Sequence, residues 1–192
     1  MERQRPIFIA EIKTKSPFGF QSAHSFNELM EYAINYGDWI SVHDNALWGG
    51  DFETIAYVRK FTHKPILAKG LHTSSEDVRQ ALEHGATHVL RVDAKPSNYT
   101  HLPYTLYEYS NIHEADKARL WFAQTVRGDM KFVCNSRDLR TGKVKEGNEL
   151  NTYLGLGNWV CQASNIAKPD DVNPNVNAFI VGTNLIEYCK AL

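Results

Sequence analysis

Polar and charged residues stand at the carboxyl ends of several short apolar runs in this sequence. Glu11 and Lys13 close the first run two positions apart, so on a strand their side chains would share a face. Further candidates at the ends of later runs are Lys69, Glu108, Asn135 and Arg137. A buried lysine or carboxylate is readily shifted into the acid–base range, and arginine suits a carboxylate or phosphate. Gathered at one end of a sheet, these groups would form an acid–base and anion-binding site, although each one alone could simply cap a strand in solvent.

Small polar residues at other run ends could bind a phosphate group. Ser16 follows the first run, Ser164 follows a later one, and Gly182 with Thr183 precedes the last helical segment. Loops after the last strands of a barrel commonly hold phosphate at a helix N-terminus, where N–H groups and the helix dipole attract anions. A Gly-Thr pair before a helix is equally typical of an ordinary helix cap, so this pattern leaves both interpretations open.

Eight apolar runs have the length and composition of strands, and helix-like segments separate most of them. The predicted strands are 6–13, 39–42, 65–69, 87–92, 105–109, 131–135, 159–163 and 178–182. The predicted helices are 25–36, 52–61, 75–84, 111–126 and 185–192, the first of them capped by Ser25 and ended by Gly37. Parallel neighbours require long connections of this kind, and eight strands close a (βα)8 TIM barrel. A flavodoxin-like open sheet is the alternative.

The predicted barrel is trimmed. The 192 residues divided among eight units give 24 per unit, against about 31 in a typical barrel. The connections after the fourth and seventh strands, 93–104 and 168–177, each contain two prolines and are therefore predicted to be loops or single turns. Without a helix over the fourth strand, Arg91 would be solvated. We predict one barrel domain over 1–192, with the loop 141–147 as its best candidate for a mobile segment.

Composition narrows the class of protein. The 21 lysines and arginines nearly balance 22 aspartates and glutamates, which argues against nucleic-acid and anionic-membrane partners. No apolar run approaches the roughly 18 residues that span a bilayer, and the first residues lack a signal-peptide cleavage site. The cysteines lie far apart, as expected in a reducing compartment: Cys134, Cys161 and Cys189. We expect a cytoplasmic monomer or weak homodimer that acts on a small molecule.

Five strings in this sequence resemble, in order, the signatures of one family, indole-3-glycerol phosphate synthase. Residues 9–17 are similar to its AEIK-x-x-SP string, and residues 40–50 to its SVLT…FFGG segment. Residues 65–71 resemble its PVLRKDF, 135–139 its NNRDL, and 178–183 its AFLVG-[ST]. That family converts 1-(2-carboxyphenylamino)-1-deoxyribulose 5-phosphate into indole-3-glycerol phosphate by ring closure, loss of CO₂ and loss of water, with no cofactor and no metal. The resemblance implies a carboxy-lyase of tryptophan biosynthesis built on a TIM barrel.

The resemblance also implies roles for individual residues. Lys69 corresponds to the general acid that protonates the substrate carbonyl oxygen, and Glu108 to the general base. Lys13 corresponds to the lysine that contacts the substrate carboxylate, and Glu11 to the carboxylate that orients the lysines. The remaining correspondences are to substrate positioning (Asn135, Arg137), packing on the anthranilate ring (Trp48) and phosphate binding (Ser16, Ser164, Gly182, Thr183). Because two neighbouring lysines depress each other's pKa, we expect the pKa of the lysine acid to be lowered toward neutrality.

The sequence departs from the family pattern at several positions. The family's VSESGI string corresponds to residues 161–166, so that Ala163 replaces a glutamate and Asn165 replaces the phosphate-loop glycine. Gly70 and Leu71 stand in place of Asp-Phe, and the segment that forms an extra helix before the first strand has no counterpart, as in a shortened member. We expect the loop after the seventh strand to close over the space at Ala163. The alternative function is therefore a phosphosugar-binding barrel with lost or altered activity.

Overall fold

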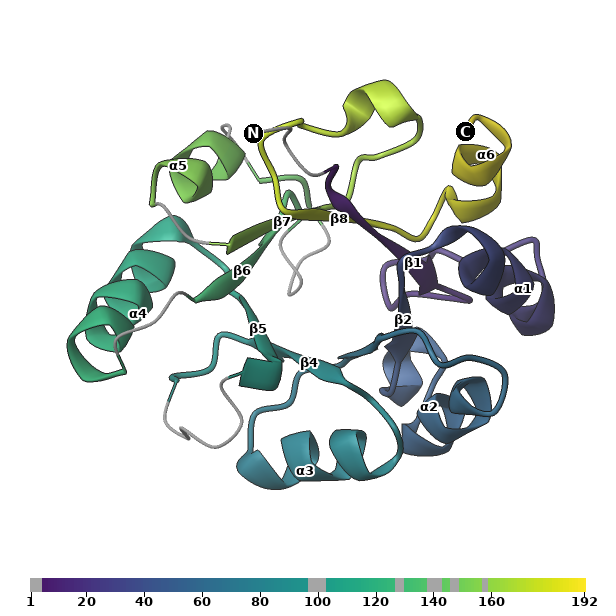
Figure 1. Ribbon diagram of the computed structural model, residues 1–192, viewed down its shortest axis with the longest axis horizontal. Helices are drawn as coiled ribbons and strands as arrows, with labels where there is room; N and C mark the ends of the chain where they lie inside the picture. Colours follow the sequence, from purple (N-terminus) through teal and green to yellow (C-terminus); the bar gives the residue numbers. More distant parts are fainter. Residues whose placement is uncertain (1–4, 97–102, 127–129, 138–142, 146–148, 157–158) are drawn as a thin grey trace.

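Eight parallel strands form a closed barrel with the strand order of the chain, β1 to β8 (Figure 1). The computed structural model describes residues 5–96, 103–126, 130–137, 143–145, 149–156 and 159–192. The strands are β1 (Ile7–Ile12), β2 (Trp39–His43), β3 (Ile66–Lys69), β4 (His88–Val92), β5 (Thr105–Glu108), β6 (Lys131–Asn135), β7 (Trp159–Ala163) and β8 (Ala178–Val181). The ring closes where β1 pairs with β8. The predicted TIM barrel is confirmed, and the open sheet is wrong.

Helices cover the outside of the barrel. They are α1 (Phe26–Tyr36), α2 (Phe52–Arg59), α3 (Ser75–Glu83), α4 (Ile112–Thr125), α5 (Glu149–Gly155) and α6 (Leu185–Lys190). Ser25 caps α1 as predicted, since its side chain accepts a hydrogen bond from the N–H of Glu28, and α1 ends before Gly37. The helix α5, with seven residues between β6 and β7, was not predicted from the sequence.

The crossovers predicted to be short are short. Between β7 and β8 the only helical segment among the described residues is the 3-10 turn η3 (Pro169–Asp171), with a proline at its start. Between β4 and β5 no described residue belongs to an α-helix, and residues 97–102 lie outside the described part. The predicted mobile loop 141–147 also lies largely outside it, because only residues 143–145 are described there.

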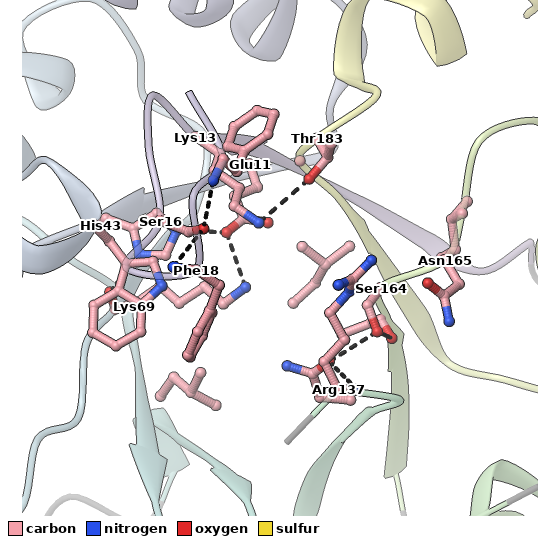
Figure 2. Close-up of a pocket in the computed structure, with 18 of the residues that line it drawn as sticks. Glu11, Lys13, Ser16, Phe18, His43, Lys69, Arg137, Ser164, Asn165 and Thr183 are labelled. Carbon is pink, nitrogen blue, oxygen red and sulfur yellow. Dashed lines mark hydrogen bonds and ion pairs between the residues drawn. The ribbon is translucent and has the colours of Figure 1, made fainter. Parts of the chain in front are cut away.

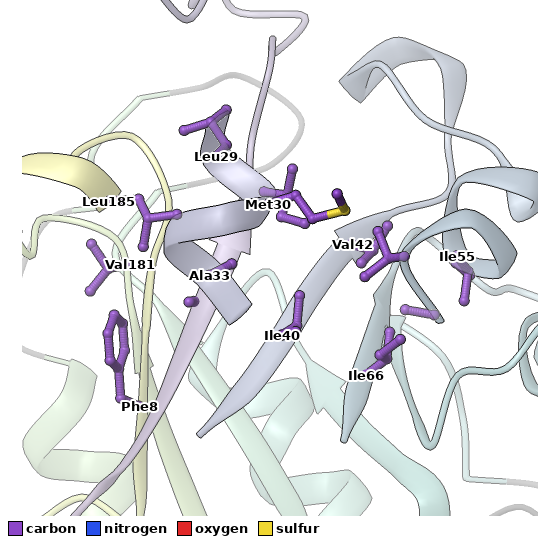
Figure 3. Packing of buried hydrophobic residues seen from close by; sticks show 14 of the residues in the cluster. Phe8, Leu29, Met30, Ala33, Ile40, Val42, Ile55, Ile66, Val181 and Leu185 are labelled. Carbon is purple, nitrogen blue, oxygen red and sulfur yellow. The ribbon is translucent and has the colours of Figure 1, made fainter. Parts of the chain in front are cut away.

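The barrel wall separates an interior layer from two outer clusters. The interior layer consists of Ile9, Leu67, Leu90, Leu106, Val133, Cys161, Ala163, Ala178 and Ile180. One outer cluster lies between β1, β2, β3, β8 and the helices α1, α2 and α6 (Figure 3). The other lies under α4 and α5 and contains Tyr107, Tyr109 and Cys134. Burial on both faces is what parallel strands require, and it fixes which side chains point into the barrel mouth.

Arg91 is a correction to the sequence analysis. It is buried, not solvated, with 6% of its surface exposed. Its guanidinium donates hydrogen bonds to the backbone carbonyls of His72 (2.8 Å) and Thr73 (2.9 Å). The loop between β3 and α3 therefore contacts Arg91, and Arg91 joins that loop to β4.

Candidate active site

A cavity of about 250 Å³ opens at the carboxyl ends of the strands. Every site residue predicted from the sequence lines this cavity except Glu108, and the additional polar lining includes His43 and Asn165. Figure 2 shows two groups that face each other across it: Glu11, Lys13, His43 and Lys69 on one side, and Arg137, Ser164 and Asn165 on the other. The barrel thus brings together residues that lie far apart in the sequence, at the position where barrel enzymes hold their substrates.

Glu11 and Lys69 form an ion pair at the floor of the cavity. Lys69 Nζ donates to Glu11 Oε1 over 2.9 Å, and the two side chains are only 13% and 6% exposed. β1 supplies the carboxylate and β3 supplies the ammonium, with β2 between them. Lys13, two residues beyond Glu11, donates to Thr183 Oγ1 over 3.3 Å. The cavity therefore holds one fixed proton donor and a second lysine that contacts the segment after β8.

The charges in this group set one another's pKa. Burial alone would raise the pKa of Glu11, but Lys69, His43 and Lys13 hold it well below its ordinary value. Burial also acts to lower the pKa of Lys69, yet the attraction of Glu11 and Glu108 outweighs it, so that this pKa is raised. The expectation that Lys69 has a lowered pKa is therefore wrong, because its carboxylate neighbours count for more than Lys13. Burial, with Lys69 and Arg137 nearby, does lower the pKa of Lys13.

His43 completes this group, and the sequence analysis missed it. Its Nε2 lies 2.6 Å from Glu11 Oε1, and its Nδ1 lies 3.2 Å from the backbone carbonyl oxygen of Lys69. Its ring is stacked parallel to that of Trp48, with the centroids 6.1 Å apart. The predicted second strand ended at Val42, one residue before this side chain. The rule that found Glu11 and Lys69, a polar residue closing a strand, would have found His43 as well.

Glu108 is buried behind the cavity wall. Asn135 Nδ2 donates to Glu108 Oε1 over 3.0 Å, while Glu108 Oε2 is buried without a hydrogen-bond partner among the described residues. Burial raises the pKa of Glu108 to about 7, although Lys69 and Asn135 act against the rise. Asn135 Oδ1 in turn accepts from Ser164 Oγ over 2.8 Å. A carboxyl with a pKa near 7 is suited to take up a proton at neutral pH.

The loop after β7 has an unusual backbone conformation. Ser164 and Asn165 are consecutive residues in the left-handed region, with φ of 64° and 56°. Asparagine tolerates this region better than most residues, which explains how Asn165 can occupy a position where glycine is expected. Its Nδ2 donates to Ser136 Oγ over 2.8 Å. Left-handed serine is strained, and strain of this kind is typical of functional loops.

Two glycines at the cavity are required by close contacts. A Cβ added to Gly182 would overlap the carboxylate of Glu11, and one added to Gly70 would overlap the carboxylate of Asp44. Asp44 is itself fixed, because its Oδ2 lies 2.6 Å from His72 Nε2. The carboxylate of Asp44, which follows β2, therefore occupies the space that a side chain at position 70 would need. This accounts for the departure from Lys-Asp-Phe at that position.

Ala163 borders two cavities. Ala163 lines the main cavity and also a smaller one of about 170 Å³ on the side of α5. Ala163 is itself buried, with 3% of its surface exposed, so the expectation that the loop after β7 closes over this position stays a prediction.

Comparison with known families agrees with the geometry. A sequence model described as indole-3-glycerol phosphate synthase matches residues 1–190. The chain belongs to the indole-3-glycerol phosphate synthase family. Membership in the indole-3-glycerol phosphate synthase family implies an enzyme of the lyase type, and the closed barrel is consistent with a shortened member.

Two further proteins are similar over a shorter stretch. Alpha-fetoprotein from Bos taurus is 29% identical over 86 residues, which are 44% of this chain and 14% of that protein. Alpha-fetoprotein from Sus scrofa is 30% identical over 87 residues, again 44% and 14% of the two chains. A stretch of this length is less than half of the barrel, so it carries no argument about the site.

Among the described residues, no helix is long and apolar enough to cross a bilayer.

Proposed function

We propose that this protein converts 1-(2-carboxyphenylamino)-1-deoxyribulose 5-phosphate into indole-3-glycerol phosphate, CO₂ and water. The observation that carries the proposal is the Glu11–Lys69 ion pair at the floor of the cavity of a family barrel. A buried ion pair is expensive to keep, because both charges lose their hydration. In a binding cavity, this ion pair holds a proton donor in one place, which is a reason to retain it despite that cost.

In the proposed ring closure, the aromatic carbon that bears the carboxylate attacks the carbonyl carbon of the sugar chain. The carbonyl oxygen takes a proton from Lys69 and becomes a hydroxyl group. The raised pKa of Lys69 means that it carries this proton at neutral pH in the free enzyme. Once its proton has gone, the Glu11 carboxylate is left without its closest cation, which favours return of a proton to Lys69 in a later step.

Loss of CO₂ and water then completes the indole ring. Decarboxylation returns the carbon–carboxylate electron pair to the ring, and departure of the hydroxyl group as water requires one proton from an acid. Lys13, whose pKa is lowered, is the proposed partner of the substrate carboxylate and participates in the dehydration. Glu108, with a pKa raised to about 7, is the proposed base. It removes a proton from the carbon next to the one that loses the hydroxyl group, so that the last double bond of the ring forms. Glu108 is hydrogen-bonded to Asn135, which lines the cavity while Glu108 does not, so this role requires a movement of the Asn135 side chain.

The rest of the cavity suits the two ends of such a substrate. Ser16, Gly182, Thr183 and the strained Ser164 are the proposed phosphate contacts, at strand ends where phosphate commonly sits in barrels. Arg137 and Asn135 are proposed to position the substrate across the cavity. Trp48, stacked on His43, offers a flat apolar surface on which an aromatic ring can pack.

A second candidate is a phosphosugar-binding barrel that no longer catalyses this reaction. The absence of a carboxylate at Ala163 favours it, because that residue lines the cavity.

One assay distinguishes the two. Purified protein is mixed with the carboxyphenylamino-deoxyribulose phosphate, and indole fluorescence is followed while calorimetry measures binding. Fluorescence that grows with turnover supports the synthase, whereas saturable binding without fluorescence supports the binding barrel and contradicts our proposal.

A further inference from the structure

His43 is the most buried polar group of the cavity whose role the family resemblance leaves open. It is 5% exposed, it ends β2, and it lies between the strands that carry Glu11 and Lys69. A histidine buried for packing alone needs one partner for its N–H, and a backbone carbonyl would supply it. His43 instead directs Nε2 at a buried carboxylate over 2.6 Å, the shorter of its two polar contacts.

The contacts converge on one oxygen atom. Glu11 Oε1 lies 2.6 Å from His43 Nε2 and 2.9 Å from Lys69 Nζ, so that a single carboxylate oxygen accepts from both. The other end of the imidazole lies 3.2 Å from the backbone oxygen of Lys69. His43 therefore contacts the main chain of Lys69 directly. It is linked to the ammonium group of Lys69 through the shared oxygen of Glu11.

The protonation of His43 fits a donor role. Burial lowers its pKa, with Glu11 acting against this and Lys69 and Lys13 acting with it. A neutral imidazole donates from one nitrogen only, and the carboxylate is the stronger acceptor of the two that it faces. The Nε2–H tautomer then donates to Glu11 and adds no further positive charge to a cavity that already holds three cationic side chains, Lys13, Lys69 and Arg137.

We propose that His43 is a positioning residue for the proton donor: its Nε2–H holds Glu11 Oε1 against Lys69 Nζ and so fixes where the ammonium group points. The inference rests on the proposed function of Lys69. It adds a contact that Lys69 alone cannot supply, since a single ion pair leaves the carboxylate able to turn about its own bonds. Trp48, stacked on the imidazole, keeps the ring in the plane that this contact needs.

Two substitutions at this position separate the hydrogen bond from the shape of the ring. His43→Leu removes the hydrogen-bond donor and puts an apolar side chain in its place. His43→Gln places an amide nitrogen as many bonds from the main chain as Nε2 of the histidine. A hydrogen bond to a charged group corresponds to about 10- to 100-fold in a rate. We expect His43→Leu to lower kcat by this factor with little change in KM, and His43→Gln to recover most of the loss.

The matched control is His88→Leu at the opposite end of the barrel, where His88 stacks on Trp39 and begins β4. It is expected to leave kcat unchanged. Thermal melts show whether each variant is folded. Turnover of His43→Leu within twofold of the parent overturns the inference, as does an equal loss in the Gln and Leu variants when both melt like the parent.

A measurement without substrate keeps the inference separate from the proposed function. Long-range ¹H–¹⁵N NMR of the substrate-free protein reports which imidazole nitrogen carries the proton. We expect the Nε2–H tautomer at neutral pH, with a proton that exchanges slowly and that shifts in Glu11→Gln. An Nδ1–H tautomer, or a signal insensitive to Glu11→Gln, overturns the inference even if the wild-type protein makes indole-3-glycerol phosphate. If the wild-type protein makes no product, the proposed function fails and this spectrum still decides whether His43 holds Glu11.

Discussion

The carboxylate of Glu11 occupies the space that a side chain at Gly182 would need. Glu11 belongs to β1 and Gly182 directly follows β8, and these two neighbouring strands close the barrel. Because Glu11 also contacts Lys69 and His43, the missing side chain of Gly182 indirectly fixes the position of the proton donor.

Gly182→Ala is therefore expected to displace Glu11 and to lower kcat by about 100-fold, the usual effect of misplacing a catalytic group by about 1 Å. Overpacking of this kind also costs about 1–3 kcal/mol in the free energy of unfolding. The matched control is Gly155→Ala in α5, where no heavy atom lies within 4 Å of the added Cβ. Steady-state kinetics and urea unfolding check both variants. Equal activity of the two would show that Glu11 tolerates displacement.

Glu108→Gln is expected to lower kcat by about 10²–10⁴-fold, the contribution of a positioned base, and to change KM much less. In the parent enzyme the base must be ionised, and burial raises the pKa of Glu108 to about 7. The kcat of the parent should therefore rise with pH through about 7, and the residual kcat of the variant should lack this limb. A variant with the same pH profile as the parent would move the base elsewhere, with Glu11 as the next candidate.

The same substitution should stabilise the protein at high pH. Burial raises the pKa of Glu108 to about 7 from the ordinary value of 4.5, so the unfolded chain releases this proton more easily than the folded one. Below pH 4.5 Glu108 is protonated in both the folded and the unfolded state and does not change the free energy of unfolding. Its destabilising effect grows as the pH rises from 4.5 to above 7. Its full size is about 3 kcal/mol by the usual conversion of pKa into free energy. Urea unfolding at pH 5 and pH 8.5 should show Glu108→Gln gaining on the parent only at the higher pH. A gain of equal size at both would contradict the assigned cause.

Ala163→Glu tests whether the missing carboxylate is a loss that the enzyme tolerates. Ala163 borders two cavities, and a longer side chain that extends into the main one would bring its charge toward the lysines there. We expect kcat/KM to rise about tenfold, as for one added hydrogen bond to a charged group, with an unchanged melting temperature. Lower activity together with a lower melting temperature would mean that the position is too tightly packed to accept it.

The fold could be predicted from the sequence because its strands are buried on both faces and appear as apolar runs. The helix α5 was not predicted because its seven residues, 149–155, are too few to show a clear helical period. Arg91 was misplaced because the sequence did not show that the loop carrying His72 and Thr73 folds over it.

The positions of the site residues could also be predicted, since strand ends converge at one end of a barrel. Their pairings could not, because these depend on which strands are neighbours and on exact distances. The raised pKa of Lys69 illustrates this, since its direction depends on two carboxylates, Glu11 and Glu108, outweighing burial. His43 shows the sensitivity to boundaries, because a strand ended one residue early hides it.

The central claim is that Lys69 delivers the proton for ring closure, and Lys69→Met tests it most directly in a single-turnover experiment with the carboxyphenylamino-deoxyribulose phosphate. The substitution keeps the length of the side chain and removes the donor, while Lys117→Met on the exposed face of α4 is the control. Because Glu11 loses its partner, Lys69→Gln serves as a second variant that keeps an N–H near the carboxylate. The account predicts that both variants fold and bind substrate, and that product forms about 10²–10⁴-fold more slowly than in the parent and in the control. Turnover within twofold of the parent in either variant would contradict it.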